Sequence, residues 1–100
     1  MAIAVRETNA GSSVLITISG RFDIHTHSEF RSSYKDKKTE VIYTVDLSET
    51  EFMDSSALGM LLSMRSHAGD NAAKVIISGC NDDLKKVFSI TNSKDMFTFM

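Results

Sequence analysis

The sequence predicts an α/β fold in which a mixed, mostly parallel sheet of four to five strands has helices packed against it. Short runs of apolar and β-branched residues, typical of strands, alternate with segments of helical periodicity after residue 20. Each later strand is reached through a helix, so it should lie parallel to the strand before it. With 100 residues, 42% of them hydrophobic, the chain suits one core, and residues 1–100 are expected to form a single domain.

Two strands are expected at the N-terminus. Apolar residues recur at every second position over residues 3–8 and again over residues 14–19. The polar, glycine-containing connection at residues 9–12 is typical of a hairpin. The first two strands should therefore pair antiparallel.

A helix and a third strand are expected next. Phe30 and Tyr34 lie four residues apart, and lysines follow them, where cations favour a helix C-terminus. We therefore expect a helix from about Thr26 to Lys37. Residues 41–47 are β-branched, aromatic or apolar almost without a break, which predicts a central strand covered on both faces.

The second half of the chain repeats this alternation. From Ser55 onward, leucines and methionines recur at helical spacing until Gly69 gives a stop signal. The remaining predicted elements are a buried strand over residues 75–77, a helix beginning at Asn81, and a short last strand over residues 96–100.

Composition excludes several classes of protein. Eleven lysines and arginines against 13 aspartates and glutamates give a net charge of −2, which offers no basic excess for binding nucleic acid. The longest apolar runs fall far short of the ~20 residues of a membrane span. The single cysteine, Cys80, has no partner for an internal disulfide, and the N-terminus has no signal core, so a cytoplasmic location is expected.

Small polar residues gather at residues 46–59, where the third predicted strand leads through a loop into the second long helix. Asp54, Ser55 and Ser56 are all favoured at helix starts, so capping is one interpretation. Two adjacent serines exceed what one cap requires, and sites in open sheets form beyond the carboxyl ends of parallel strands. Both a cap and a functional serine are open interpretations of this pattern.

These residues resemble the sequence motif of a known family. The runs DLS at 46–48 and FMDSSALG at 52–59 resemble the signature of STAS domains, which are named for sulfate transporters and anti-sigma factor antagonists. As a bare domain, the chain resembles a free-standing bacterial anti-sigma factor antagonist. Ala57 stands where the family usually has glycine, which bears on the fit of the loop to a partner. Weaker matches lie at GRFD (20–23), EFR (29–31), 74–79 and 84–88.

The resemblance implies a regulatory switch. It implies that the serine directly after the aspartate, Ser55, is phosphorylated by a partner serine kinase of the anti-sigma factor type and dephosphorylated by a metal-dependent serine phosphatase. Ser56 is the alternative, because both hydroxyls stand at the helix start. The unphosphorylated form would bind the partner, and a phosphate, adding about −1.5 to −2 charges, would release it. No enzymatic activity, cofactor or metal is expected.

Other residues are predicted to support this site. Asp23 matches a family position beside the serine loop, where it either caps a helix start or positions the kinase. Asp46 and Ser48 close the third predicted strand and are expected to brace the same loop. The partner is expected to bind along the second helix, at Asp23, Asp54, Ser56, Ala57, Leu58, Met60 and Leu61.

The remaining interpretations have less support. Serine hydrolase chemistry needs an activated nucleophile, and the Gly-x-Ser-x-Gly pattern is absent. His25 and His27 have no convincing third ligand, so surface histidines are a better interpretation than zinc ligands. The alternative function is a constitutive STAS docking subunit of a transporter or stress-sensing assembly, in which the serine is only a cap.

Overall fold

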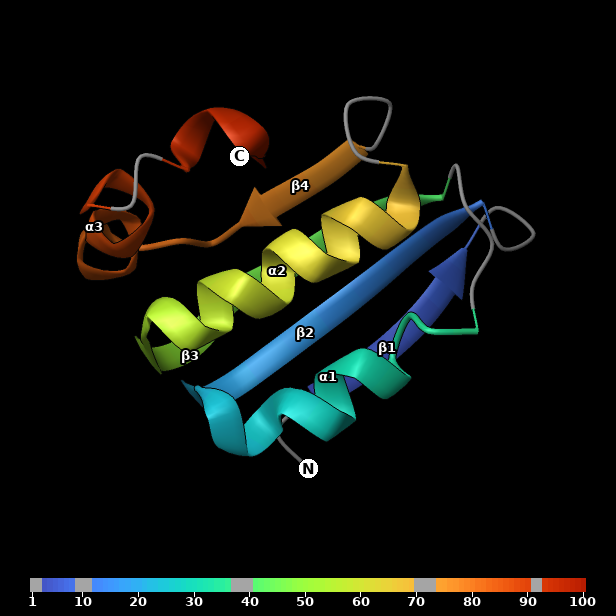
Figure 1. The fold of residues 1–100 in the computed structure, drawn as a ribbon, viewed down its shortest axis with the longest axis horizontal. Helices are drawn as coiled ribbons and strands as arrows, with labels where there is room; N and C mark the ends of the chain where they lie inside the picture. The colour runs from blue at the N-terminus through green and yellow to red at the C-terminus, as the bar shows by residue number, and fades with distance from the viewer. Residues whose placement is uncertain (1–2, 9–11, 37–40, 70–73, 91–92) are drawn as a thin grey trace.

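The described residues form one five-stranded sheet in the order β1-β2-β3-β4-β5. Figure 1 labels β1 to β4 of this sheet. The structure, a computed structural model, describes residues 3–8, 12–36, 41–69, 74–90 and 93–100. β1 pairs antiparallel with β2, and every later neighbouring pair is parallel. This confirms the predicted mixed, mostly parallel α/β fold; the predicted hairpin connection lies largely outside the described residues. The elements are β1 (Ile3–Thr8), β2 (Ser13–Phe22), α1 (His27–Ser32), β3 (Ile42–Met53), α2 (Ser55–Ala68), β4 (Lys74–Ser78), α3 (Asp82–Ile90) and β5 (Thr98–Phe99).

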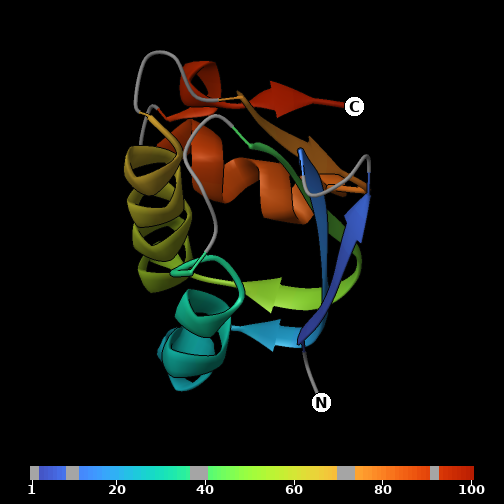
Figure 2. The ribbon, with the colours of Figure 1, turned by 90° about the vertical axis from the view of Figure 1, so that its right-hand side faces the viewer.

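Helices α1, α2 and α3 lie on one side of the sheet (Figure 2). Side chains alternate between the two faces of each strand, and those on the helix side of β2 and β3 are buried. Val14, Ile16 and Val45 are fully buried on that side, whereas Leu15 and Thr44 on the other face are only half-buried. The hydrophobic core therefore lies between the sheet and its helices.

Helix α2 has clear signals at both ends. Asp54 has extended backbone, and its side chain accepts a hydrogen bond from the backbone N–H of Ala57. At the other end, Gly69 adopts a φ of 121° and donates its N–H to the carbonyls of Arg65 and Ser66. Between these residues, one face of the helix packs into the core, which fixes the position of its N-terminus relative to the sheet.

The largest difference between the predicted and observed elements is the length of β3, which runs to Met53 instead of ending at residue 47. The polar stretch after residue 47 looked like loop, but residues 49–53 pair in parallel with residues 19–22 of β2. Two register shifts, between Thr17 and Ser19 and between Gly20 and Arg21 of β2, each place one extra residue on β3, and Gly20 at the second shift has a φ of 78°. The strand thus delivers the chain directly into α2.

Two further boundaries differ. α1 is shorter than the helix predicted to end at Lys37, because the N–H groups of Ser33 and Tyr34 bond to carbonyls three residues back and tighten the chain into turns; residue 37 lies outside the described residues. A short 3-10 helix precedes α1 at Ile24–Thr26. Another occupies Lys94–Met96, so β5 is limited to two residues of the predicted 96–100.

Candidate functional site

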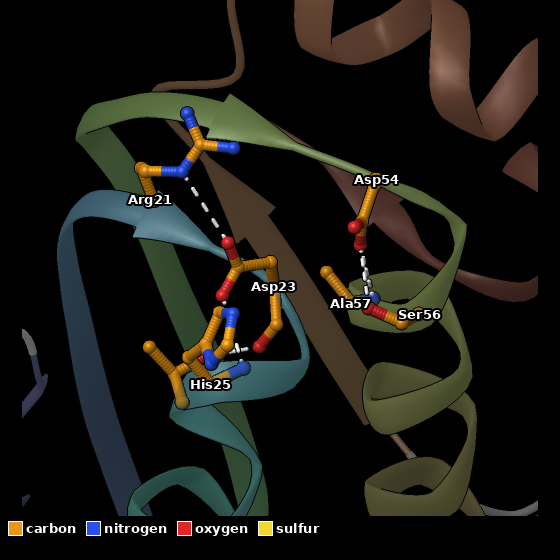
Figure 3. A network of polar contacts seen from close by, with 7 residues as sticks. Arg21, Asp23, His25, Asp54, Ser56 and Ala57 are labelled. Carbon is orange, nitrogen blue, oxygen red and sulfur yellow. Dashed lines mark hydrogen bonds and ion pairs between the residues drawn. The ribbon is translucent and has the colours of Figure 1, made fainter.

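The start of α2 is built around the carboxylate of Asp54. Its Oδ1 accepts a hydrogen bond from the backbone N–H of Ala57 at 3.1 Å and from the hydroxyl of Ser56 at 2.6 Å (Figure 3). The hydrogen bond from Ser56 is the largest cause that lowers the pKa of Asp54, and the N–H of Ala57 adds to it. The carboxylate therefore stays ionised at neutral pH and serves as the helix cap.

The two adjacent serines have different surroundings. Ser55 is the first residue of α2 and is exposed. Ser56 is half-buried, and its Oγ is held by Asp54. Both serines lie at the end of the helix where free backbone N–H groups favour negative charge.

A second polar turn lies beside this one, at the carboxyl end of β2. Residue Phe22 pairs with Met53, so Asp23 and Asp54 each follow a strand at the same edge of the sheet (Figure 3). The buried Asp23 accepts a hydrogen bond from the N–H of His25 at 3.0 Å. Its backbone carbonyl accepts one from the hydroxyl of Thr26 at 2.7 Å. Asp23 thus caps the short 3-10 helix, which is the structural one of its two predicted roles.

Exposed side chains flank these two turns. The guanidinium of Arg21 lies 4.3 Å from the centre of the Phe52 ring and its Nε lies 3.3 Å from Asp23 Oδ2. Phe52 is 39% exposed and Ile24 is 59% exposed. We call Arg21, Ile24 and Phe52 the exposed rim of the site. Sequence reasoning did not single it out, because no local pattern shows that the apolar side chains of Phe52 and Ile24 are exposed.

Four of the predicted partner-binding residues are in the core. Ala57, Leu58, Met60 and Leu61 have exposed fractions of 0%, 3%, 5% and 0%. Their helical spacing marks the buried face of α2, so in this conformation they offer a partner almost no surface. Met53 and Met64 are buried as well.

Asp46 and Ser48 do not brace the serine loop in the described contacts. They lie within β3, where the N–H of Ser48 donates to Asp46 Oδ1 at 3.0 Å. The expectation depended on the strand ending at residue 47, and the strand continues for six more residues to Met53. The contact is a local turn-like bond inside the strand.

The described part of the chain gives little support for a metal site, a reactive cysteine or a membrane-spanning helix. No group of three or more His, Cys, Asp or Glu side chains there is placed to hold a metal ion. Burial raises the pKa of the Cys80 thiol, which disfavours the reactive thiolate. In the same described ranges, no helix combines the length and the apolar character that crossing a bilayer requires.

Comparisons with known proteins match the chain to STAS domains. A family model described as "Mlab, STAS domain" matches residues 5–98. A STAS-domain containing protein of Pseudomonas aeruginosa (strain UCBPP-PA14) is 39% identical over 98 residues, which cover 97% of each chain. The anti-sigma-B factor antagonist of Listeria monocytogenes (serovar 1/2a) is 24% identical over 83 residues, 81% of this chain and 73% of the relative.

Solved structures share the fold. A putative anti-sigma factor antagonist from Thermotoga maritima superimposes with a TM-score of 0.82 at 17% identity, covering 97% of this chain and 84% of that one. The anti-sigma factor antagonist SpoIIAA in its unphosphorylated form gives 0.72 at 20% identity, covering 99% and 87%. At these identities the similarity is one of fold.

Proposed function

The chain belongs to the STAS domain family, and from this premise we propose that it is a non-enzymatic, cytoplasmic anti-sigma factor antagonist switched by serine phosphorylation at the start of α2. Relatives of similar length are named anti-sigma-B factor antagonists. SpoIIAA, which shares the fold, has been solved in a phosphorylated form as well as an unphosphorylated one. These names support a binding protein whose partner is an anti-sigma factor. We further propose that this partner is a serine kinase.

The observation that carries the proposal is the contact between Ser56 and Asp54. A half-exposed hydroxyl is fixed by an ionised carboxylate at the free end of a helix. Phosphorylation would replace the hydroxyl proton by a group with about −1.5 to −2 charges and remove the donor. The 2.6 Å attraction would become a repulsion between two anions.

This contact supports Ser56 over Ser55 as the switch residue, although motif position favours Ser55. At Ser55, which is exposed, a phosphate adds charge without breaking a described side-chain bond. At Ser56 it must also disturb Asp54, which caps α2 through Ala57. A phosphate on Ser56 is therefore coupled to the shape of the loop, whereas one on Ser55 acts through charge alone.

The partner would bind the exposed ends of the two turns. The exposed rim of Arg21, Ile24 and Phe52 supplies burial area next to the serines, while the core residues of α2 hold the helix in place. A dianion at Ser56 would have to be desolvated in such an interface. Losing ~3 to 4 kcal/mol of binding free energy would weaken the complex several-hundred-fold, which is enough for a switch.

The cycle needs two further activities. The partner kinase transfers the γ-phosphoryl group of ATP to the serine oxygen, which loses its proton, and ADP leaves. A metal-dependent phosphatase returns the serine by hydrolysis of the phosphate ester, which releases inorganic phosphate. This chain supplies only the acceptor hydroxyl and its surroundings.

The test is phosphate mapping combined with partner capture. The wild type and the variants Ser55→Ala, Ser56→Ala and Ser63→Ala are expressed in the native cells, and each protein is analysed by intact and peptide mass spectrometry. Ser63 is an exposed serine of the same helix and is the matched control. We expect phosphate in the wild type and in Ser63→Ala and its loss in Ser56→Ala, with Ser56→Asp failing to capture the partner.

Two other outcomes would change the proposal. Loss of phosphate only in Ser55→Ala would move the switch to Ser55, as motif position predicts. No phosphate under any growth or stress condition, with Ser55→Asp and Ser56→Asp binding the partner like wild type, would overturn the switch and favour the constitutive docking subunit.

A further inference from the structure

A hollow of about 200 Å³ lies between the edge strand β1 and helix α1, away from the serine turns. Its lining consists of Ile3 and Val5 from the strand and Glu29, Ser32 and Ser33 from the helix segment. Figure 1 shows α1 beside the β1 edge of the sheet. Val5 is 43% exposed, which leaves apolar surface open at the wall of the hollow.

One wall of the hollow has an unusual polar group. The Oε2 atom of Glu29 is buried, and no hydrogen-bond partner for it exists among the described residues. A buried carboxylate oxygen without a donor costs free energy, because burial separates it from bulk water and none of the described residues supplies a hydrogen bond in exchange. A cationic donor in the hollow would recover that cost.

A segment that pairs with the neighbouring strand β1 would bring such a cationic donor into the hollow. Among the described residues β1 has β2 as its one neighbouring strand, so its outer edge presents backbone N–H and C=O groups for pairing. An extended segment that pairs with this edge adds a strand to the sheet and points every second side chain to the helix side. One such side chain would enter the hollow beside Glu29.

The chemistry favours a lysine. The apolar side chains of Ile3 and Val5 suit a methylene stem, and a compact ammonium group carries three N–H donors for Glu29. A second copy of β1 is a poorer occupant. Its helix-side residues would be Ile3, Val5 and Glu7, since these pair with the inward Ile18, Ile16 and Val14 of β2, and Glu7 would bring a carboxylate in place of a cation.

We propose that the outer edge of β1 binds an extended, lysine-containing segment of another protein, with the lysine seated in the hollow against Glu29. The main-chain pairing supplies most of the contact, and the carboxylate selects the residue. This surface is separate from the serine turns, so the proposal stands independently of the proposed phosphorylation switch.

The test uses a defined probe and the purified full chain. The blocked peptide TVTKTVT, which places valine, lysine and valine on one face of a strand, is titrated into ¹⁵N-labelled protein and followed by amide chemical shifts. We expect shifts centred on β1 and on residues 29–33. Replacing the peptide lysine by norleucine, or Glu29 by Gln, should weaken binding about tenfold or more.

The matched control is Glu51→Gln, which changes an exposed glutamate of β3 and should bind the peptide like wild type. The proposal is overturned if the peptide causes no shifts at β1 at millimolar concentration, or if the norleucine peptide and Glu29→Gln bind unchanged. Shifts at β1 that depend on protein concentration without peptide would instead show self-association and would also overturn it.

Discussion

At the scale of single residues, the candidate site depends on the hydrogen bonds that Asp54 accepts. One carboxylate oxygen accepts both the N–H that starts α2 and the hydroxyl of Ser56, so the helix cap and the candidate switch share an atom. A cap alone would be satisfied by many small polar residues. The sharing explains how a change at one serine hydroxyl can reach the backbone of the helix start.

This sharing predicts the behaviour of two Asp54 variants. Asp54→Ala removes the cap and should destabilise the protein by about 1 kcal/mol, whereas Asp54→Asn, which retains a capping oxygen, should cost little. Urea unfolding at pH 7 measures both. Because the pKa of Asp54 is lowered in the folded state, its ionised form stabilises the protein above pH ~4, and the advantage over Ala should be lost as the pH falls through the lowered pKa. Equal stability of the two variants at pH 7 would rule out the cap.

At the scale of elements, the site depends on how closely neighbouring strands approach. Gly79 directly follows β4 with a φ of 68°, and a Cβ on it would lie 2.7 to 2.8 Å from the Cβ, Cα and N atoms of Ser48 in β3. No other residue type fits there without moving one of the two strands. This contact fixes the end of β4 against the part of β3 that leads towards α2.

Two glycine substitutions test this packing. Gly79→Ala should destabilise the protein by about 2 to 4 kcal/mol, because it adds both an unfavourable φ and a steric overlap. Gly59→Ala is the matched control. It lies in α2 with nothing within 4 Å of its added Cβ, so it should stabilise by about 0.5 to 1 kcal/mol. Denaturant midpoints of the two variants on the same side of wild type would contradict this picture.

At the scale of the whole molecule, one core joins the sheet to its helices and sets how stability responds to pH. Tyr43 is fully buried in that core, and its Oη has no hydrogen-bond partner among the described residues. Burial, with smaller contributions from Tyr34 and Glu7, raises the pKa of Tyr43 to about 12. Ionisation of this residue therefore opposes folding.

The sign of the effect follows from the direction of the shift. A folded-state pKa above the unfolded value of about 10 gives stability that is complete below pH 10 and lost as the pH rises to about 12. Relative to Tyr43→Phe, wild type should lose about 1.4 kcal/mol between pH 8 and pH 11, as measured by urea unfolding. At pH 8 the variant should be as stable as wild type or slightly more stable. Parallel losses in both proteins would show that Tyr43 does not ionise on unfolding.

The fold class could be predicted from the sequence because its signals are local. Alternation in β2, the buried run that begins β3, and the periodicity of α2 between Asp54 and Gly69 each depend on residues a few positions apart. The position of the candidate site could be predicted for the same reason, since a run of capping residues after a strand is visible without tertiary contacts. The family resemblance was confirmed by the comparisons.

Only the tertiary structure decided which side chains are available. The spacing that defines α2 is the same whether Leu58 and Leu61 face the core or a partner, and packing against the sheet buries them. The polar second half of β3 is a strand because β2 pairs with it, a contact between segments about 30 residues apart. The exposed rim at Phe52 and the hollow at Glu29 likewise exist only once distant segments are brought together, because burial and register are properties of pairs of elements.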